Sequence, residues 1–242
     1  VLYNEYCQRS ESVDSSAFII LGLGDSVING GTLTDQDSLA TTRLSKSLTQ
    51  LLQRKVQVLN ISAGSWGPDN CEAYLKRYGA FNAKIAFLLC SSHDAHDNIN
   101  HQSVVDVNPS FPSSQYHIAY WELLHRYLLP RLLRQKTPSE ISKDGKSFNL
   151  GFQQLINRFK VENIPFFIWL HPDRTELVNE NYNEEGTLII DFCENNSIHC
   201  IKGLDYMDIQ DYRDEIHVNE KGQKKITKIL LDYLISLIDN KL

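Results

Sequence analysis

Short runs of apolar residues alternate along the chain with longer segments in which apolar residues recur at helical spacing. The runs predict five buried strands, at residues 17–21, 56–61, 84–90, 164–170 and 199–204. The other segments predict helices, at residues 38–54, 69–78, 150–159, 184–196 and 219–238. Strands that are apolar throughout and separated by helices are typical of a parallel sheet covered on both faces. The pattern therefore predicts an α/β fold in three layers, with a central parallel sheet of about five strands.

Residues 95–146 interrupt this alternation. Asn, Pro and Ser residues cluster between positions 98 and 114, and the helix predicted after them has apolar residues on one face. Pro130 is expected to kink or end that helix, because proline lacks the N–H group that a helix interior needs. Residues 136–146 indicate an exposed loop. Since no repeat or domain boundary is visible, we expect one domain, 1–242, with an insertion at about 95–146.

The composition is that of a globular protein, with 42% hydrophobic and 22% charged residues among 242. A formal net charge of -6 argues against a nucleic-acid partner, and no apolar run reaches the roughly 18 residues of a membrane span. The chain starts at Val1 and its only methionine is Met207, so we expect a missing N-terminal segment, either removed on export or trimmed. Export would place the protein in the periplasm or outside the cell, while a cytoplasmic location stays open. The five widely spaced cysteines do not decide between these locations.

Chemically useful residues follow the predicted strands, at the edge where a parallel sheet carries its reactive groups. Ser26 comes directly after the first strand, at the end of the segment Gly22–Ser26. A serine hydroxyl becomes a good nucleophile when an imidazole, itself held by a carboxylate, takes its proton. Asp214 and His217 lie three residues apart just before the last helix, so the carboxylate can orient the ring. We therefore expect Ser26 as nucleophile, His217 as base and Asp214 as the residue that orients it.

The segment Gly24-Asp25-Ser26, together with Asp214-x-x-His217, resembles the first and fifth sequence blocks of the SGNH (GDSL-type) hydrolase superfamily. The two motifs stand in the family's order, at opposite ends of an α/β pattern. The resemblance implies a flavodoxin-like three-layer α/β/α sandwich. It also implies acyl-ester chemistry through a covalent acyl-enzyme.

The resemblance further implies an oxyanion hole with three donors. The backbone N–H of Ser26 is one, and a glycine after the second strand supplies another, for which we expect Gly64, although Ser65 could present its N–H equally well. The third donor in the family is the asparagine of a Gly-x-Asn-Asp block, where this chain reads Ser91-Ser92-His93-Asp94. A neutral imidazole can donate one N–H, so His93 either takes over this role or forms a structural hydrogen bond.

Two other kinds of site compete for the same residues. Gly22-x-Gly24 after a strand begins a dinucleotide-binding fingerprint, but its third glycine is missing. The segment His93-Asp94-Ala95-His96-Asp97, with His101 beyond, resembles a metal-ligand cluster. Its i, i+3 spacing can put two imidazoles on one face, yet no third ligand is indicated. The Gly-x-Ser-x-Gly elbow of the α/β-hydrolases is absent from the sequence. We expect neither a cofactor nor a metal.

The interpretation that fits these residues is a serine esterase that removes acyl groups, above all acetyl groups, from a carbohydrate. The insertion is expected near the active edge, where aromatic side chains would stack on sugar rings or else pack in the core: Phe111, Tyr116, Tyr120 and Trp121. One alternative is an O-acetyltransferase acting on a cell-surface polysaccharide through the same acyl-enzyme. Another is a catalytically inactive glycan-binding domain. The expected partner is a small-molecule or glycan ester, with no nucleic acid and no membrane insertion, and the oligomeric state stays open.

Overall fold

The computed structural model describes residues 1–101, 105–107, 112–133 and 141–239. The chain forms two compact units, one comprising Val1–Asn98 with Gly145–Leu242 and the other comprising Ile99–Asp144. The larger unit holds every residue of the predicted Ser–His–Asp set. Whether residues 95–146 are an insertion in a single domain, close to the active edge, stays a prediction.

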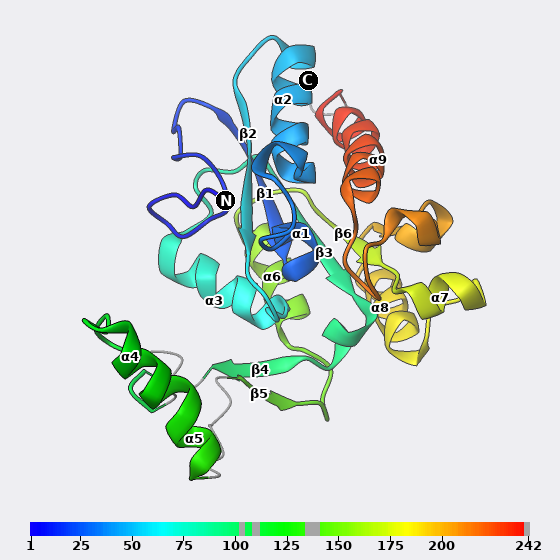
Figure 1. Ribbon diagram of the computed structural model, residues 1–242. Helices are drawn as coiled ribbons and strands as arrows, with labels where there is room; N and C mark the ends of the chain where they lie inside the picture. The colour runs from blue at the N-terminus through cyan, green and yellow to red at the C-terminus, as the bar shows by residue number, and fades with distance from the viewer. Residues whose placement is uncertain (102–104, 108–111, 134–140, 240–242) are drawn as a thin grey trace. The chain divides into compact units, whose positions relative to one another are not determined.

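The larger unit is built on a five-stranded sheet with the strand order β2-β1-β3-β6-β7 (Figure 1). All four pairings between neighbouring strands are parallel. The strands are β1 (Phe18–Gly24), β2 (Val56–Ser62), β3 (Ile85–Ser91), β6 (Phe166–His171) and β7 (Cys200–Lys202). Almost every residue of the first four strands is buried, as a sheet covered on both faces requires. The predicted α/β class and the strand number are confirmed.

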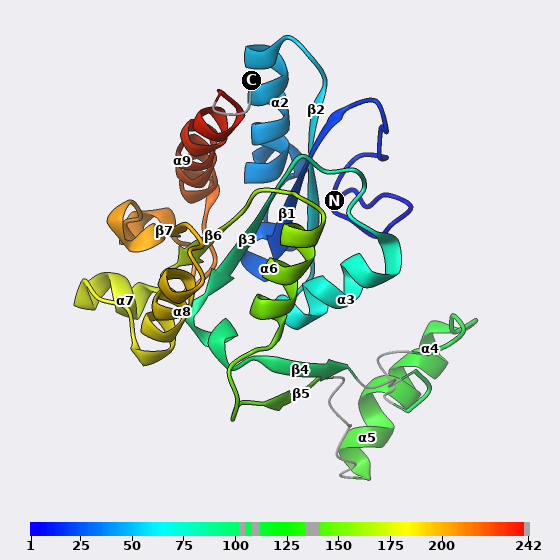
Figure 2. The ribbon, with the colours of Figure 1, turned by 180° about the vertical axis from the view of Figure 1, so that it is seen from behind.

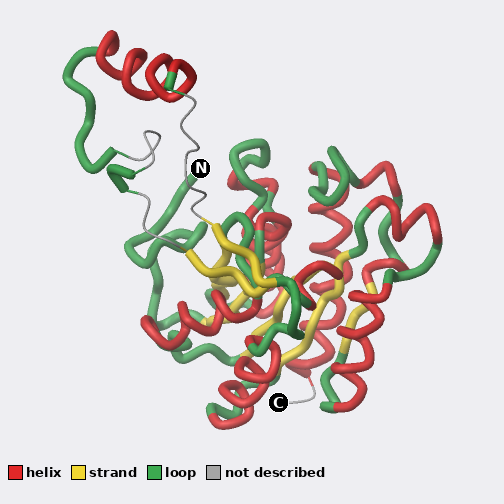
Figure 3. Tube along the Cα trace, turned by 90° about the horizontal axis from the view of Figure 1, so that it is seen from below, coloured by secondary structure: helices red, strands yellow, loops and turns green. Residues whose placement is uncertain are grey.

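Helices cover both faces of this sheet (Figure 2), and the strands run between them in Figure 3. One face packs against α1 (Ser26–Asn29), α2 (Ala40–Leu52) and α9 (Glu220–Asp239). The other packs against α3 (Pro68–Tyr78), α6 (Gly151–Val161) and α8 (Glu184–Asn195). Two apolar cores, one on each face, make the predicted three-layer sandwich. No helix in the described part of the chain is long and apolar enough to cross a membrane.

The turn after β1 is fixed by a glycine. Gly24, the last residue of β1, has φ +155°, a conformation that side chains rarely adopt. A Cβ atom at Gly24 would overlap the carbonyl oxygen of Leu89 in the neighbouring strand β3. Asp25 and Ser26 therefore leave the sheet at a defined point of its carboxyl edge.

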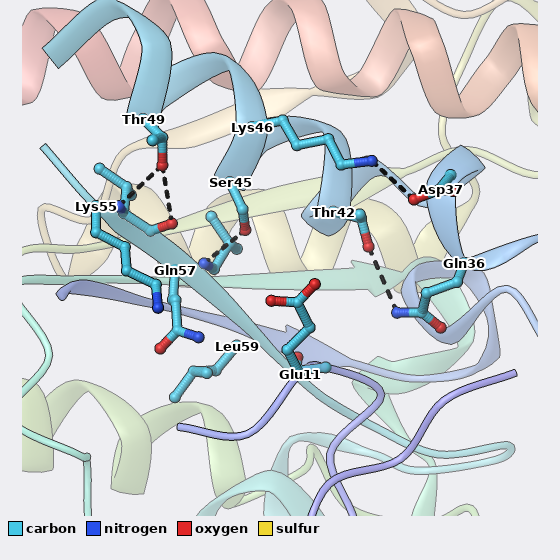
Figure 4. Close-up of a pocket in the computed structure, with 13 residues that line it drawn as sticks. Glu11, Gln36, Asp37, Thr42, Ser45, Lys46, Thr49, Lys55, Gln57 and Leu59 are labelled. Carbon is cyan, nitrogen blue, oxygen red and sulfur yellow. Dashed lines mark hydrogen bonds and ion pairs between the residues drawn. The ribbon is translucent and has the colours of Figure 1, made fainter. Parts of the chain in front are cut away.

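Strand β2 forms one edge of the sheet, and its outer side is covered by side chains of α2. The backbone N–H groups of Val56 and Val58 donate to the hydroxyls of Thr49, at 3.0 Å, and Ser45, at 2.9 Å (Figure 4). A cavity of about 260 Å³ lies along this edge, and none of the candidate site residues lines it.

The smaller unit contains the helical stretch predicted after position 114. It comprises α4 (Ala119–Glu122), a π-helical segment (Leu123–Leu128) and α5 (Leu129–Leu132). The helix is not ended by Pro130, since it continues to Leu132. The turns directly before the proline are π-helical, which is where the loss of its N–H and the clash of its ring with the carbonyl four residues back distort a helix.

Part of the predicted loop at 136–146 is a strand. Strand β5 (Ile141–Asp144) pairs with β4 (Asn98–His101) in a two-stranded sheet, whereas residues 134–140 lie outside the described residues. The prediction of an exposed loop is wrong for β5, because pairing with a distant segment satisfies backbone groups of a polar sequence that has no strand periodicity. Sequence reasoning also missed α7 (Arg174–Asn179), a short helix that Asp173 caps by accepting a hydrogen bond from Glu176 N at 2.8 Å.

Candidate active site

Ser26 lies at the start of the short helix α1, at the carboxyl edge of the sheet. Asp25 caps this helix, since its Oδ1 accepts a hydrogen bond of 2.8 Å from Val27 N. The helix ends after one turn, where Gly30 takes a left-handed conformation and its N–H donates to the carbonyl of Ser26. The local sequence thus holds Ser26 in a tight strand-to-helix turn, with its side chain partly exposed.

Two residues that are far from Ser26 in the sequence meet it at this edge. The imidazole Nε2 of His217 lies 2.9 Å from Ser26 Oγ. Its Nδ1 lies 2.9 Å and 3.0 Å from the two carboxylate oxygens of Asp214. Since a carboxylate only accepts hydrogen bonds, the ring carries its proton on Nδ1 and its Nε2 can accept the hydroxyl proton. The structure brings together the three residues that the end motifs predict.

The environment of Asp214 favours its ionised form. Partial burial acts to raise the pKa of this carboxyl, but hydrogen bonds from the backbone N–H groups of His217 and Ile216, and from the imidazole, lower it below its usual value. The guanidinium of Arg213 adds positive charge, with its Nε 3.7 Å from Asp214 Oδ2. A carboxylate held in this way can orient the ring and stabilise an imidazolium that forms beside it.

His93 lies among three carboxylates, one of which belongs to Asp25, the residue next to the nucleophile. The Nε2 atom of His93 lies 3.9 Å from Asp25 Oδ2, 4.0 Å from Asp94 Oδ1 and 3.8 Å from Asp97 Oδ2. Asp25 is only 3% exposed. Burial and the neighbouring Asp94 carboxylate raise the pKa of Asp25 to about 7, although the hydrogen bond from Val27 N opposes this shift.

The expected oxyanion donors lie in the loops after β1, β2 and β3. His93 belongs to the 3₁₀ turn Ser92–Ala95 directly after β3, and its side chain is 41% exposed. Gly64 is exposed after β2, and a Cβ atom there would meet nothing within 4 Å. The left-handed conformation that favours glycine belongs instead to Ser65, with φ +60°. The roles of Gly64, Ser65 and His93 as donors stay predictions.

Among the described residues, one group has the donor atoms that could hold a metal ion. It consists of Asp25, His93 and Asp94, whose ligand atoms lie within 4.8 Å of one another. Of the sequence-predicted cluster, His93 and Asp94 belong to this group. His96 does not, and its Nδ1 lies 3.1 Å from Glu185 Oε1.

Three of the aromatic residues expected to contact sugars, Tyr116, Tyr120 and Trp121, belong to the described part of the smaller unit. Tyr120 and Trp121 have 74% and 55% of their surface exposed, and Tyr116 lies near His125, with ring centroids 6.4 Å apart. Phe111 lies outside the described residues.

Sequence reasoning assigned no role to one buried histidine at the reactive edge. His171 ends β6, is fully buried and donates a hydrogen bond of 2.9 Å from Nε2 to the carbonyl of Ile216. Its position directly after the predicted strand 164–170 was the available signal, but a hydrogen bond to a residue 45 positions away leaves no mark in the sequence.

No family model matches the sequence, and no curated protein matches it. The chain is similar to the solved structure of the psychrotrophic esterase EstA from Pseudoalteromonas sp., inhibited by monoethylphosphonate, with 14% identity over 92% of this chain and 99% of that one and a TM-score of 0.53. It is similar to an acetyl xylan esterase, AlAXEase, with 12% identity over 89% and 98% of the two chains and a TM-score of 0.54. It also resembles a two-domain esterase active on acetylated mannans, with 9% identity over 91% of this chain but 49% of that one, and a TM-score of 0.57. These likenesses establish a shared fold.

Proposed function

Since this chain has the SGNH hydrolase fold, we propose that it is a serine ester hydrolase with Ser26, His217 and Asp214 as its catalytic triad. The observation that carries the proposal is the continuous hydrogen-bonded path from Ser26 Oγ through the His217 ring to the Asp214 carboxylate. Its members come from opposite ends of the chain, yet they meet at the edge where this fold carries its reactive groups.

The geometry supports a two-step reaction. Ser26 Oγ attacks the ester carbonyl while His217 Nε2 takes the hydroxyl proton, and the same imidazole then returns that proton to the departing alcohol oxygen. This step leaves an acyl group on Ser26 Oγ. A water molecule next gives a proton to His217 and attacks the acyl carbonyl. The bond from the acyl carbon to Ser26 Oγ then breaks, the imidazole returns the proton to Ser26 Oγ, and the carboxylic acid leaves. Asp214 stays ionised throughout and stabilises the imidazolium.

We propose that the oxyanion formed in each step is stabilised by the backbone N–H of Ser26, by a backbone N–H at Gly64 or Ser65 and by the side chain of His93. Support for this comes from the chain positions, since each donor stands two or three residues after the end of a strand of the sheet. Donors of this kind act on the charge that develops in the transition state.

For the substrate we propose an acetylated carbohydrate. Two of the solved structures that share the fold are an acetyl xylan esterase and an esterase active on acetylated mannans. The net charge of -6 disfavours nucleic acid and other polyanionic partners. Tyr120 and Trp121, exposed aromatic residues of the smaller unit, are candidates for stacking on sugar rings. A polysaccharide substrate would place the enzyme outside the cytoplasm.

Rapid-mixing kinetics with p-nitrophenyl acetate test the proposal. We expect a burst of p-nitrophenol equal to the enzyme concentration, an acetyl group on Ser26 in the intact mass, and neither in Ser26→Ala. Absence of ester turnover in the wild type, with neither burst nor adduct, would refute the assignment. Acetylated xylan and mannan fragments then test the substrate class, and an added sugar acceptor that becomes acetylated in place of water would identify a transferase.

A further inference from the structure

We propose that His171 is a positioning residue, which fixes the loop carrying Asp214 and His217 against the end of strand β6. Among the described residues, no hydrogen bond joins His171 to Ser26, and its effect on the reaction passes through this loop. The inference rests on the proposed function, because it concerns how the base of that reaction is held.

One peptide group connects His171 to the triad. The carbonyl of Ile216 accepts the hydrogen bond from His171 Nε2, and the N–H of the same peptide group, on His217, donates to Asp214 Oδ1 at 2.8 Å. His171 and Asp214 thus hold this peptide group from its two ends. Because the peptide is planar, fixing both ends fixes the N–Cα bond of His217, about which its side chain is placed.

The ring of His171 is itself held in place by packing. It is fully buried and stacks on Tyr212, with ring centroids 5.2 Å apart and planes at 25°. The Tyr212 hydroxyl donates to the carbonyl of Pro172 at 2.6 Å, and Tyr212 forms an antiparallel bridge with Val218 across the base of the loop. The backbone N–H of Arg174 also donates a hydrogen bond of 2.9 Å to the carbonyl of Glu215 in this loop. The loop is therefore attached to the β6 end of the sheet on both sides of Ile216.

The protonation state of His171 suits this role. Burial lowers its pKa to about 4, and the positive charge that His217 or His93 can carry acts in the same direction, while the hydrogen bond to Ile216 opposes the shift. At neutral pH the ring is neutral. The single proton must then lie on Nε2, because a carbonyl oxygen only accepts. Nδ1 is buried and has no hydrogen-bond partner among the described residues, so nothing there competes for the proton.

A matched pair of variants separates the hydrogen bond from the packing. His171→Phe keeps a stacking ring but removes the donor, and His171→Gln removes the ring but keeps an N–H donor of similar reach. Because a displacement of about 1 Å at a catalytic group can cost about 10²-fold in rate, we expect His171→Phe to lower kcat about 10²-fold with little change in KM. His171→Gln should recover most of this loss. His199→Phe, at an exposed histidine that precedes β7, is the control and should leave kcat unchanged.

Two outcomes overturn the inference: a folded His171→Phe variant with wild-type kcat, or a folded His171→Gln variant as slow as His171→Phe. If neither variant folds, long-range ¹H–¹⁵N NMR on the wild type decides. We expect His171 to show the Nε2–H form unchanged from pH 5 to 8, and an Nδ1–H form or a titration in that range overturns the proposal. If the wild type does not turn over acetyl esters, the proposed function fails, while the NMR result still reports on the hydrogen bond.

Discussion

Replacing Asp25 by asparagine should make the protein more stable at alkaline pH. Asp25 is buried beside Asp94, and its pKa is raised to about 7 by burial and by that second carboxylate. Asparagine has nearly the same shape and keeps an oxygen that can accept the capping hydrogen bond from Val27 N. The substitution therefore removes the ionisable group and leaves the start of α1 intact.

The size of the effect follows from the two pKa values. An unfolded aspartate has a pKa of about 3.9, so between about pH 4 and pH 7 the folded state binds a proton at Asp25 that the unfolded state has lost. The unfolding free energy falls as the pH rises through this window. A shift of about 3 units corresponds to a loss of up to about 4 kcal/mol by pH 8, and Asp25→Asn should avoid this loss.

Urea unfolding followed by circular dichroism at pH 5, 6, 7 and 8 measures the effect. The difference in unfolding free energy between Asp25→Asn and wild type should grow in favour of the variant as the pH rises. Asp173→Asn, the same change at the aspartate that caps α7, controls for the loss of a capping charge and should keep the wild-type slope. A difference that stays constant from pH 5 to 8 would refute the reasoning.

Three further predictions concern the site and its support. Ser26→Ala and His217→Ala should each abolish acetyl ester turnover with an unchanged circular dichroism spectrum, and Asp214→Asn should lower kcat by up to about 10⁴-fold because the ring loses its tautomer. His93→Ala should lower kcat by about 10²–10³-fold with little effect on KM, and His93→Asn should restore much of it; wild-type kcat in His93→Ala would exclude His93 as an oxyanion donor. Arg9→Met should lower the free energy of unfolding in urea by about 3 kcal/mol, because the fully buried Arg9 guanidinium donates to three backbone carbonyls in and after α1; a loss under about 0.5 kcal/mol would contradict this.

The sheet could be predicted from the sequence because its strands are buried on both faces. The run 84–90 is apolar after Lys84, and the run 56–61 is apolar except at the buried residues Gln57 and Asn60. The structure differs from the prediction only at the ends of these strands. Helix α1 could not be predicted in the same way, since its four residues carry no periodicity and depend on the Asp25 cap and the turn at Gly30.

The meeting of Ser26 with Asp214 and His217 was predicted from motif order and from the position of each motif relative to the sheet. The side-chain directions were not accessible to that reasoning. Nothing in the sequence shows that one ring nitrogen of His93 faces three carboxylates, or that His171 holds the carbonyl of Ile216. Both depend on how loops from different strands fold over the same edge.

The covered edge of β2 limits how copies of this protein can associate. An open strand edge offers unpaired N–H and C=O groups to another chain, and hydroxyls of α2 already occupy two of these positions. The N-terminal segment pairs with the next backbone groups of this edge, those of Asn60. The Asn60 N–H donates to Ser10 Oγ, and the Arg9 N–H donates to the Asn60 carbonyl. The opposite edge is β7, with three residues. Growth of the sheet by strand addition, the route that leads to fibrous aggregates, is thereby opposed at both ends.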